Sequence, residues 1–209
     1  MHNSTLRPLP RSFYDRDPRT VARDLLGKLL VRGARGRISL IGRIVELEAY
    51  LGLKDPAAHS FHGMTLRNAV LFGPPGHAYV YFIYGNHYCL NVSCQPPGVA
   101  GGVLFRALEP IQGEVQMAKN RSIELLREPD HHNLTNGPGK LSEAFGITRA
   151  RDNNCDLTSS KSDLWIAGND EPVGKIRRTP RIGIRHAVEH PYRFLIAGNP
   201  FVSGPKMQR

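Results

Sequence analysis

Cysteine is scarce in this sequence, and its few cysteines follow no recognisable pattern. The 209 residues include only three, Cys89, Cys94 and Cys155. An odd number without a C-x-x-C spacing argues against both a disulfide framework and a zinc knuckle. The chain is long enough to bury a core without such crosslinks. An intracellular, reducing compartment fits this composition best.

Long hydrophobic runs, targeting signals and repeats are also missing. No run approaches the length of a transmembrane helix, and the N-terminus lacks the apolar centre of a signal peptide. We therefore expect no membrane partner. The length fits one generous domain or two small ones, and only the loop-like stretch REPDHHNLT at residues 127–135 hints at a boundary.

Acidic residues are few compared with basic ones. The chain has 28 Lys and Arg against 18 Asp and Glu, a net charge of +10. Such a surface suggests a polyanionic partner, most often nucleic acid, although it can also serve solubility alone. The densest basic stretch, residues 175–186, has no acid to balance Lys175, Arg177, Arg178, Arg181 and Arg185. These side chains are candidates for phosphate contacts, with a solvated basic loop as the equal alternative.

The segment Gly42 to Ser60 combines an alternating pattern with reactive side chains. It reads GRIVELEAYLGLKDPAAHS. Alternation places Ile44, Glu46, Glu48 and Tyr50 on one strand face and Val45, Leu47 and Ala49 on the other. His59 follows in a loop, so a carboxylate, a phenol and an imidazole lie near the end of one rigid strand, which holds side chains well for chemistry. The simpler interpretation is a strand with one solvated face and a loop histidine.

The strongest β signal is AYVYFIYGNHYCLNVSC, which predicts strands over 79–84 and 88–93 joined by a tight turn. If the turn has three residues, Tyr81 lies directly across from Asn91. Tyr84 then sits at the tip of the hairpin, where its ring can enter a DNA duplex. The alternative is ordinary cross-strand packing of aromatic side chains.

The other patterns predict short helices and strands around these two segments. Asp17-Pro18 is typical of a helix start, and Gly27 of its end. Residues 28–31 and 38–49 form a predicted hairpin, and residues 102–108 a strand that is buried apart from Arg106 and ends at Glu109-Pro110. Further helices are predicted over 66–71, 114–127 and 141–145, and strands over 164–166 and 192–197. The stretch NGPGK before residue 141 lacks the Walker A spacing but suits a DNA phosphate at Gly139 and Lys140.

Metal and serine chemistry find little support in these patterns. There are nine histidines but neither an H-E-x-x-H motif nor a His/Cys cluster, and no G-x-S-x-G elbow. The remaining constellation is Glu48, Tyr50, His59, Tyr81 and Asn91. Aromatic walls with a carboxylate suit an extruded base held for attack on its glycosidic bond. The carboxylate could activate water and offset the positive charge that develops on the sugar.

The runs GRIVELEAYLGLKDPAAHS, GHAYVYFIYGNHYCLNVS, FRALEP, NGPGKL and RIGI, with a closing NPFVSG, resemble the alkyladenine (3-methyladenine) DNA glycosylase family over residues 12–204. The resemblance implies an α+β fold: one compact domain around a curved antiparallel sheet, with a protruding hairpin and surrounding helices. Residues 1–11 and 205–209 would be flexible tails. It also implies a monofunctional enzyme, without metal or cofactor, that releases damaged purines with water and leaves an abasic site. Its partner would be double-stranded DNA, and we expect a monomer.

The resemblance also implies roles for single residues. Glu48 corresponds to the water-activating glutamate, and Tyr50, His59 and Tyr81 to the residues that sandwich and orient the flipped base. Tyr84 corresponds to the tyrosine that fills the gap in the duplex, Asn91 to the asparagine of the pocket floor, and Arg106 to the arginine of the R-A-L-E-P strand. Two departures concern loops near the DNA: Leu66 replaces the usual proline of T-P-R-N, and the loop after Gln95 is longer. A non-enzymatic DNA-binding module and a metal-dependent nuclease remain the alternatives.

Overall fold

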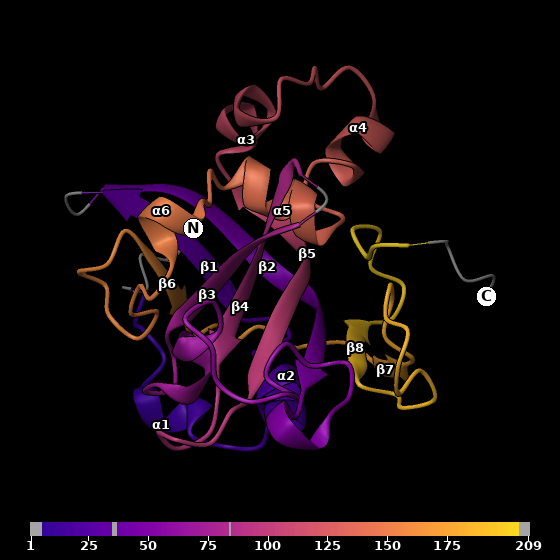
Figure 1. Ribbon diagram of the computed structural model, residues 1–209. Coiled ribbons are helices and arrows are strands. Elements are labelled where there is room, and N and C mark those ends of the chain that lie inside the picture. Colours follow the sequence, from indigo (N-terminus) through magenta and orange to yellow (C-terminus); the bar gives the residue numbers. More distant parts are fainter. Residues whose placement is uncertain (1–5, 35–36, 84, 205–209) are drawn as a thin grey trace.

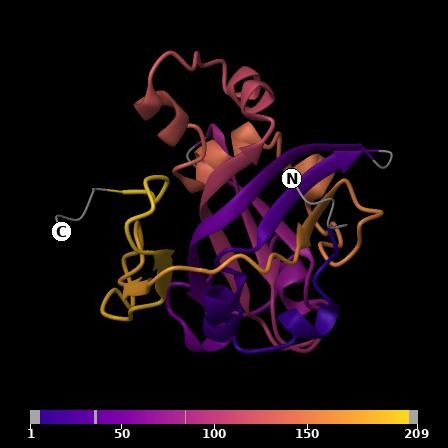
Figure 2. The same cartoon turned by 180° about the vertical axis from the view of Figure 1, so that it is seen from behind.

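The computed structural model describes residues 6–34, 37–83 and 85–204. Within them, eight strands form one antiparallel sheet, and short helices surround it (Figures 1 and 2). The strand order is β3-β4-β5-β2-β1-β6, while β8 pairs with β2 and β7 with β8. The sheet and its helices make one compact α+β domain, which confirms the predicted fold class.

Most of the elements are short. The strands are β1 (Leu29–Ala34), β2 (Arg37–Tyr50), β3 (Ala78–Ile83), β4 (His87–Ser93), β5 (Gly102–Gln112), β6 (Leu164–Ala167), β7 (Ile176–Thr179) and β8 (Arg193–Ile196). The helices are α1 (Arg11–Tyr14), α2 (Pro18–Leu25), α3 (Glu114–Asn120), α4 (Glu128–His132), α5 (Pro138–Ala144) and α6 (Arg149–Asp152). Two 3-10 turns are η1 (Gly52–Lys54) and η2 (Ala69–Phe72).

Strand β2 is the longest element and organises the sheet. One of its edges pairs with β5, and the other is shared by β1 and, nearer its end, by β8. The register with β5 skips a residue between Ile44 and Glu46. Because of this bulge, Ile44 joins Val45 in the main hydrophobic core instead of sharing a face with Glu46. The expected alternation therefore holds from Val45 to Tyr50, and Ile44 alone departs from it.

The two faces of the central strands bury different side chains. One face carries the main core, to which Leu47, Val80, Leu90 and Phe105 contribute. Helix α2 packs against β2 and β5, while α5 packs against β4 and β5. The alternate residues of β3, β4 and β5 form a smaller cluster with η2, made of Leu71, Tyr79, Tyr81, Cys89 and Leu104. This second face is the one that also carries the carboxylates of β2.

Helix α2 begins and ends where the sequence indicates. The side chain of Asp17 accepts a 2.8 Å hydrogen bond from the backbone N–H of Arg19, and Pro18 is the first helical residue. Gly27 adopts a φ of +79°, and a Cβ there would lie 2.4 Å from Val173 Cγ2. Only glycine satisfies both demands, so the chain turns sharply from α2 into β1.

Three expectations about the remaining elements are wrong. Strand β5 continues through Glu109-Pro110 to Gln112. The helix predicted over 114–127 stops at Asn120, because Ser122 adopts a left-handed φ of +51°, and α4 follows separately. Part of the expected N-terminal tail is packed: Leu9 is buried, and Arg11 donates a 2.6 Å hydrogen bond to the carbonyl of Pro75.

Candidate functional site

A cavity of about 490 Å³ opens on the second face of the sheet. All four residues predicted to form the base pocket line it: Tyr50, His59, Tyr81 and Asn91. The wall is completed by loop residues 56–60, by the start of α5 at residues 137–140 and by residues 182–186 after β7. Segments that are distant in the sequence thus meet around one cavity, whose surface is mostly apolar.

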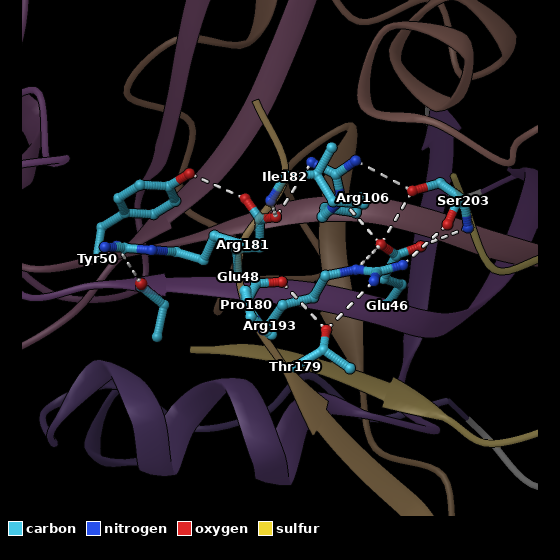
Figure 3. Close-up of polar contacts among 11 residues, drawn as sticks. Glu46, Glu48, Tyr50, Arg106, Thr179, Pro180, Arg181, Ile182, Arg193 and Ser203 are labelled. Atoms are coloured by element: carbon cyan, nitrogen blue, oxygen red, sulfur yellow. Dashed lines mark hydrogen bonds and ion pairs between the residues drawn. The ribbon is translucent and has the colours of Figure 1, made fainter. Parts of the chain in front are cut away.

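Glu48 is fully buried beside this cavity, and both of its carboxylate oxygens are bound (Figure 3). Oε2 accepts a 2.9 Å hydrogen bond from the hydroxyl of Tyr50, and Oε1 accepts one of 2.7 Å from the backbone N–H of Ile182. Nη1 of Arg106 lies 3.2 Å from Oε1. Burial raises the pKa of Glu48, while these three donors act in the opposite direction. The solvated face of the simpler interpretation does not exist, since Glu46 is also fully buried.

The aromatic wall of the cavity is built around His59. Its ring meets that of Tyr81 edge-on, with ring centroids 4.5 Å apart, and its Nδ1 lies 3.0 Å from the hydroxyl of Tyr79. Burial, assisted by the charge of Arg67, lowers the pKa of His59, so the imidazole is neutral at pH 7. Tyr79 was not among the predicted site residues, although its alternation with Tyr81 along β3 could have indicated it.

The hairpin of β3 and β4 has a different register from the predicted one. Ile83 pairs with His87, so Tyr79 lies across from Asn91 and Tyr81 across from Cys89. Because the pairing shifts by two residues, the side chains keep their face and Asn91 still lines the cavity. The predicted position of Tyr84 at the tip falls on a residue outside the described part of the chain.

Arg181 was predicted to contact DNA, but it is buried beneath Tyr50. Its guanidinium donates to both carboxylate oxygens of Asp55, at 2.5 and 2.9 Å, and its Cζ lies 4.6 Å from the centroid of the Tyr50 ring. Asp55 also accepts hydrogen bonds from the backbone N–H groups of Leu51 and Ala57. This ion pair joins the end of β2, the loop that carries His59 and the segment that brings Ile182 to Glu48.

Arg106 is the second predicted DNA contact that is buried, with 6% of its surface exposed. Its Nε donates a 2.8 Å hydrogen bond to Glu46. The sequence analysis did not predict the pairing of Arg106 with Glu46, because a single arginine on an apolar strand gives no indication of its partner. The other basic candidates, Arg177, Arg178 and Arg185, are exposed, and Arg185 lines the cavity.

The start of α5 also borders the cavity. Gly139 and Lys140, the two residues of the NGPGK stretch that were predicted to contact a DNA phosphate, line it. Nζ of Lys140 donates to the side chains of Asn133 and Asn136. A Cβ on Gly139 would lie 2.9 Å from the ring of His87, the first residue of β4 after the turn of the hairpin. Glycine therefore permits a close approach between α5 and β4.

A further residue that the sequence analysis missed holds the loop of His59 in place. The side chain of Asn68 is buried and donates hydrogen bonds of 2.9 Å to the carbonyl of His59 and 3.1 Å to that of Gly63. Its Oδ1 accepts from the backbone N–H of Thr65 at 2.7 Å. The neighbouring Leu66 is 99% exposed.

The described residues offer neither a cluster of metal ligands nor a membrane-spanning helix. Within residues 6–34, 37–83 and 85–204, no three His, Cys, Asp or Glu side chains come together as ligands for a metal ion. In the same part of the chain, no helix has the length and apolar character needed to cross a bilayer.

The site is thus a buried carboxylate beside a cavity with aromatic walls, in a basic α+β domain. Comparison with known proteins gives the family. The family model described as "Methylpurine-DNA glycosylase (MPG)" matches residues 12–200. The chain belongs to the methylpurine-DNA glycosylase family, so it is a hydrolase of N-glycosidic bonds in DNA and acts in DNA repair.

Individual relatives agree with the family match, and several carry the name "Putative 3-methyladenine DNA glycosylase". The relative from Koribacter versatilis is 59% identical over 202 residues, which cover 96% of this chain and 95% of the relative. That from Burkholderia lata is 46% identical, covering 96% and 93%. That from Methanocella arvoryzae is 49% identical over 200 residues, covering 93% and 95%.

Proposed function

We propose that this DNA glycosylase is monofunctional, acts on duplex DNA as a monomer and excises alkylated purines, as well as deaminated ones such as hypoxanthine. It extrudes the damaged base into the cavity, cleaves the glycosidic bond with water and leaves an abasic site. One observation carries the proposal: the carboxylate of Glu48 is buried, both of its oxygens accept hydrogen bonds, and Tyr50 and Ile182, which donate them, line an aromatic cavity.

Glu48 has the role of activating the attacking water. Its carboxylate accepts a proton from the water and offsets the positive charge that develops on the sugar as the bond breaks. The hydrogen bonds from Tyr50 and Ile182 fix both oxygens, so the group does not need to reorient during the reaction. Burial keeps the negative charge poorly solvated and thereby strengthens its action on a nearby sugar.

The base itself is held by Tyr50, His59 and Tyr81, with Asn91 against one of its edges. The cavity volume of about 490 Å³ is in the range of pockets that enclose small molecules. A neutral His59 adds no positive charge beside an alkylated base that already carries one. Tyr84 is assigned to the gap in the duplex on the family resemblance alone.

Alkylated purines and hypoxanthine should be released at different rates, because they differ as leaving groups. An alkylated purine carries a positive charge and is a good leaving group without help. Hypoxanthine is neutral and leaves well only after protonation, so we expect slower excision from the same duplex. The exposed arginines Arg177, Arg178 and Arg185, together with Lys140, are the proposed phosphate contacts.

The experiment uses a duplex with one hypoxanthine, incubated with the protein and then heated in alkali. Strand breaks that appear only after alkali support a monofunctional glycosylase. Breaks without alkali, especially if a chelator abolishes them, indicate a nuclease or a lyase. Binding without breaks under either condition would mean that the protein binds this lesion but does not excise it. A parallel duplex with an alkylated adenine then shows whether the protein fails to excise hypoxanthine alone or has no glycosylase activity.

A further inference from the structure

Glu46 is a second buried carboxylate beside the proposed catalytic one, and the reaction described above does not use it. It is two residues before Glu48 on β2 and none of its surface is exposed. Its Oε1 accepts hydrogen bonds from Arg106 Nε at 2.8 Å, Arg193 Nε at 2.6 Å and Ser203 Oγ at 2.9 Å (Figure 3). Its Oε2 accepts one of 2.5 Å from the backbone N–H of Ser203. A buried charge is tolerated only with such a set of partners.

Arg106 connects this carboxylate to the catalytic one. Its Nε binds Glu46, its Nη1 lies 3.2 Å from Glu48 Oε1, and its Nη2 donates a 3.1 Å hydrogen bond to Ser203 Oγ. The three nitrogens of one planar guanidinium are thus divided among three partners. Without Glu46, the full charge of Arg106 would act on Glu48.

Arg193 contributes a second positive charge on the same side. Its backbone lies across from Glu48 in the pairing of β2 with β8. Its side chain also reaches Thr179 Oγ1 at 3.2 Å and the carbonyl of Ser203 at 2.8 Å. Glu46 therefore binds two arginines, one that also contacts the Glu48 carboxylate and one that is paired with Glu48 across the strands, and the segment around Ser203 closes over it.

We propose that Glu46 is a positioning residue for base excision: by holding Arg106 and Arg193, it limits the positive charge that acts on Glu48 and keeps Glu48 able to take a proton from water. The inference rests on the proposed role of Glu48. Ser203 has a supporting part, since its N–H and hydroxyl both fix the orientation of Glu46.

The charges around Glu48 balance only when Glu46 is present. Glu48 is faced by Tyr50 and Glu46 on its own strand, Cys89 of β4, Arg106 of β5, Arg193 of β8, and Arg181 after β7. Arg181 is neutralised by Asp55. Glu46 and ionised Glu48 then match Arg106 and Arg193, so the removal of Glu46 leaves one buried positive charge in excess.

The direction of the expected effect follows from these charges. The negative charge of Glu46 acts to raise the pKa of Glu48. In Glu46→Gln, that charge is lost and Arg106 is free to act on Glu48, so the acid limb of the pH–rate profile should move to lower pH by about one unit. In Arg193→Gln, a positive charge is lost while Glu46 remains, so the limb should move to higher pH. Opposite shifts cannot arise from a general loss of stability.

The test measures single-turnover release of an N3-methylated adenine from duplex DNA between pH 4 and 9. This base is cationic while it is attached to the sugar and leaves as a neutral molecule, so no protonation of the leaving group adds a second limb. Asp152→Asn is the matched control, because it breaks the buried ion pair with Arg32, at 2.9 Å, away from the cavity. It should lower stability without moving the pH profile. Thermal unfolding gives the folded fraction of each variant.

Each outcome is decisive for one of the two proposals. A Glu46→Gln profile that overlays the wild-type one, scaled only by the folded fraction, would overturn the role of Glu46. If Glu46→Gln does not fold, the pH–rate profile of Arg193→Gln is the test. If its acid limb does not move to higher pH, the proposed role of Glu46 is overturned. If instead Glu48→Gln retains the wild-type rate, the proposed function of Glu48 itself fails, whatever the other variants do.

Discussion

Asn91 of β4 lies directly across from Tyr79 of β3, and its side-chain amide donates a 3.2 Å hydrogen bond to the backbone carbonyl of Tyr79. This bond holds a nearly buried amide against the wall of the cavity. Guanine differs from adenine and hypoxanthine by an exocyclic 2-amino group, which a fixed amide can exclude by contact. We predict that Asn91→Ser admits guanine-type bases while adenine-type lesions are excised much as before.

The effect of Asn91→Ser should be moderate, because one steric contact contributes about 1–3 kcal/mol of discrimination. Single-turnover excision of guanine and hypoxanthine from otherwise identical duplexes measures it. A guanine-to-hypoxanthine rate ratio equal to that of the wild type would mean that Asn91 is not the filter.

Glu48→Gln should abolish base release while DNA binding survives. The amide keeps the size of the side chain but cannot take a proton from water, so the rate should fall by at least ~100-fold. Binding to an undamaged duplex should remain at the wild-type level, because it does not depend on a group this deeply buried. A wild-type single-turnover rate in this variant would contradict the assignment.

Tyr50→Phe tests the hydrogen bond that holds the carboxylate of Glu48, the proposed general base. The variant keeps the ring over Arg181 but removes the 2.9 Å hydrogen bond to Glu48 Oε2. A hydrogen bond to a charged group contributes about 1.5–3 kcal/mol, so we expect a rate loss of about 10-fold or more with little change in affinity for DNA. Tyr14→Phe is the control, since the buried hydroxyl of Tyr14 has no partner among the described residues. Equal rates for Tyr50→Phe and the wild type would show that this bond does not assist catalysis.

The sequence predicts the sheet well because its strands alternate or are strongly apolar and its turns contain glycine. It also places Glu48 and Tyr50 correctly, since both lie on the unbroken end of β2. It fails where partners come from distant segments. The patterns of residues 175–186 indicate five similar cations, yet Arg181 is buried because Asp55, 126 residues away in sequence, binds it. Bulges and left-handed residues, as at Val45 and Ser122, also leave no clear sequence signal.

Acid should weaken the fold through the ion pair of Asp55 with Arg181. Burial acts to raise the pKa of Asp55, but its hydrogen bonds from Arg181 and from the backbone N–H groups hold it below its usual value. A carboxylate with a lowered pKa stabilises the folded state above its unfolded pKa of about 3.9, and this stabilisation is lost as the pH falls through the lower folded value. The free energy of unfolding should therefore fall below pH about 4.

Asp55→Asn should remove this contribution at every pH. It leaves Arg181 buried without its partner, so the cost at pH 7 should be about 3–5 kcal/mol, and the gap to the wild type should narrow below pH about 4. Urea unfolding at pH 7 and at pH 3.5 measures both. Asp163→Asn, at a carboxylate with 53% of its side chain exposed, should change stability by no more than about 0.5 kcal/mol. A constant gap for Asp55→Asn between the two pH values would contradict the assignment to this ion pair.

Arg185 is the exposed arginine whose position best fits an interaction with a DNA phosphate, because it also lines the cavity. Removing one cation that neutralises a duplex phosphate reduces the slope of log K against log salt by about 0.9. We predict that Arg185→Gln weakens binding to an undamaged duplex and lowers the slope by that amount. The measurement is fluorescence anisotropy over a salt series. Arg23→Gln, on α2 with 58% of its side chain exposed, removes the same charge away from the cavity and should leave the slope unchanged. Equal slopes for the two variants would mean that net charge, rather than direct binding of a phosphate by Arg185, governs the affinity for DNA.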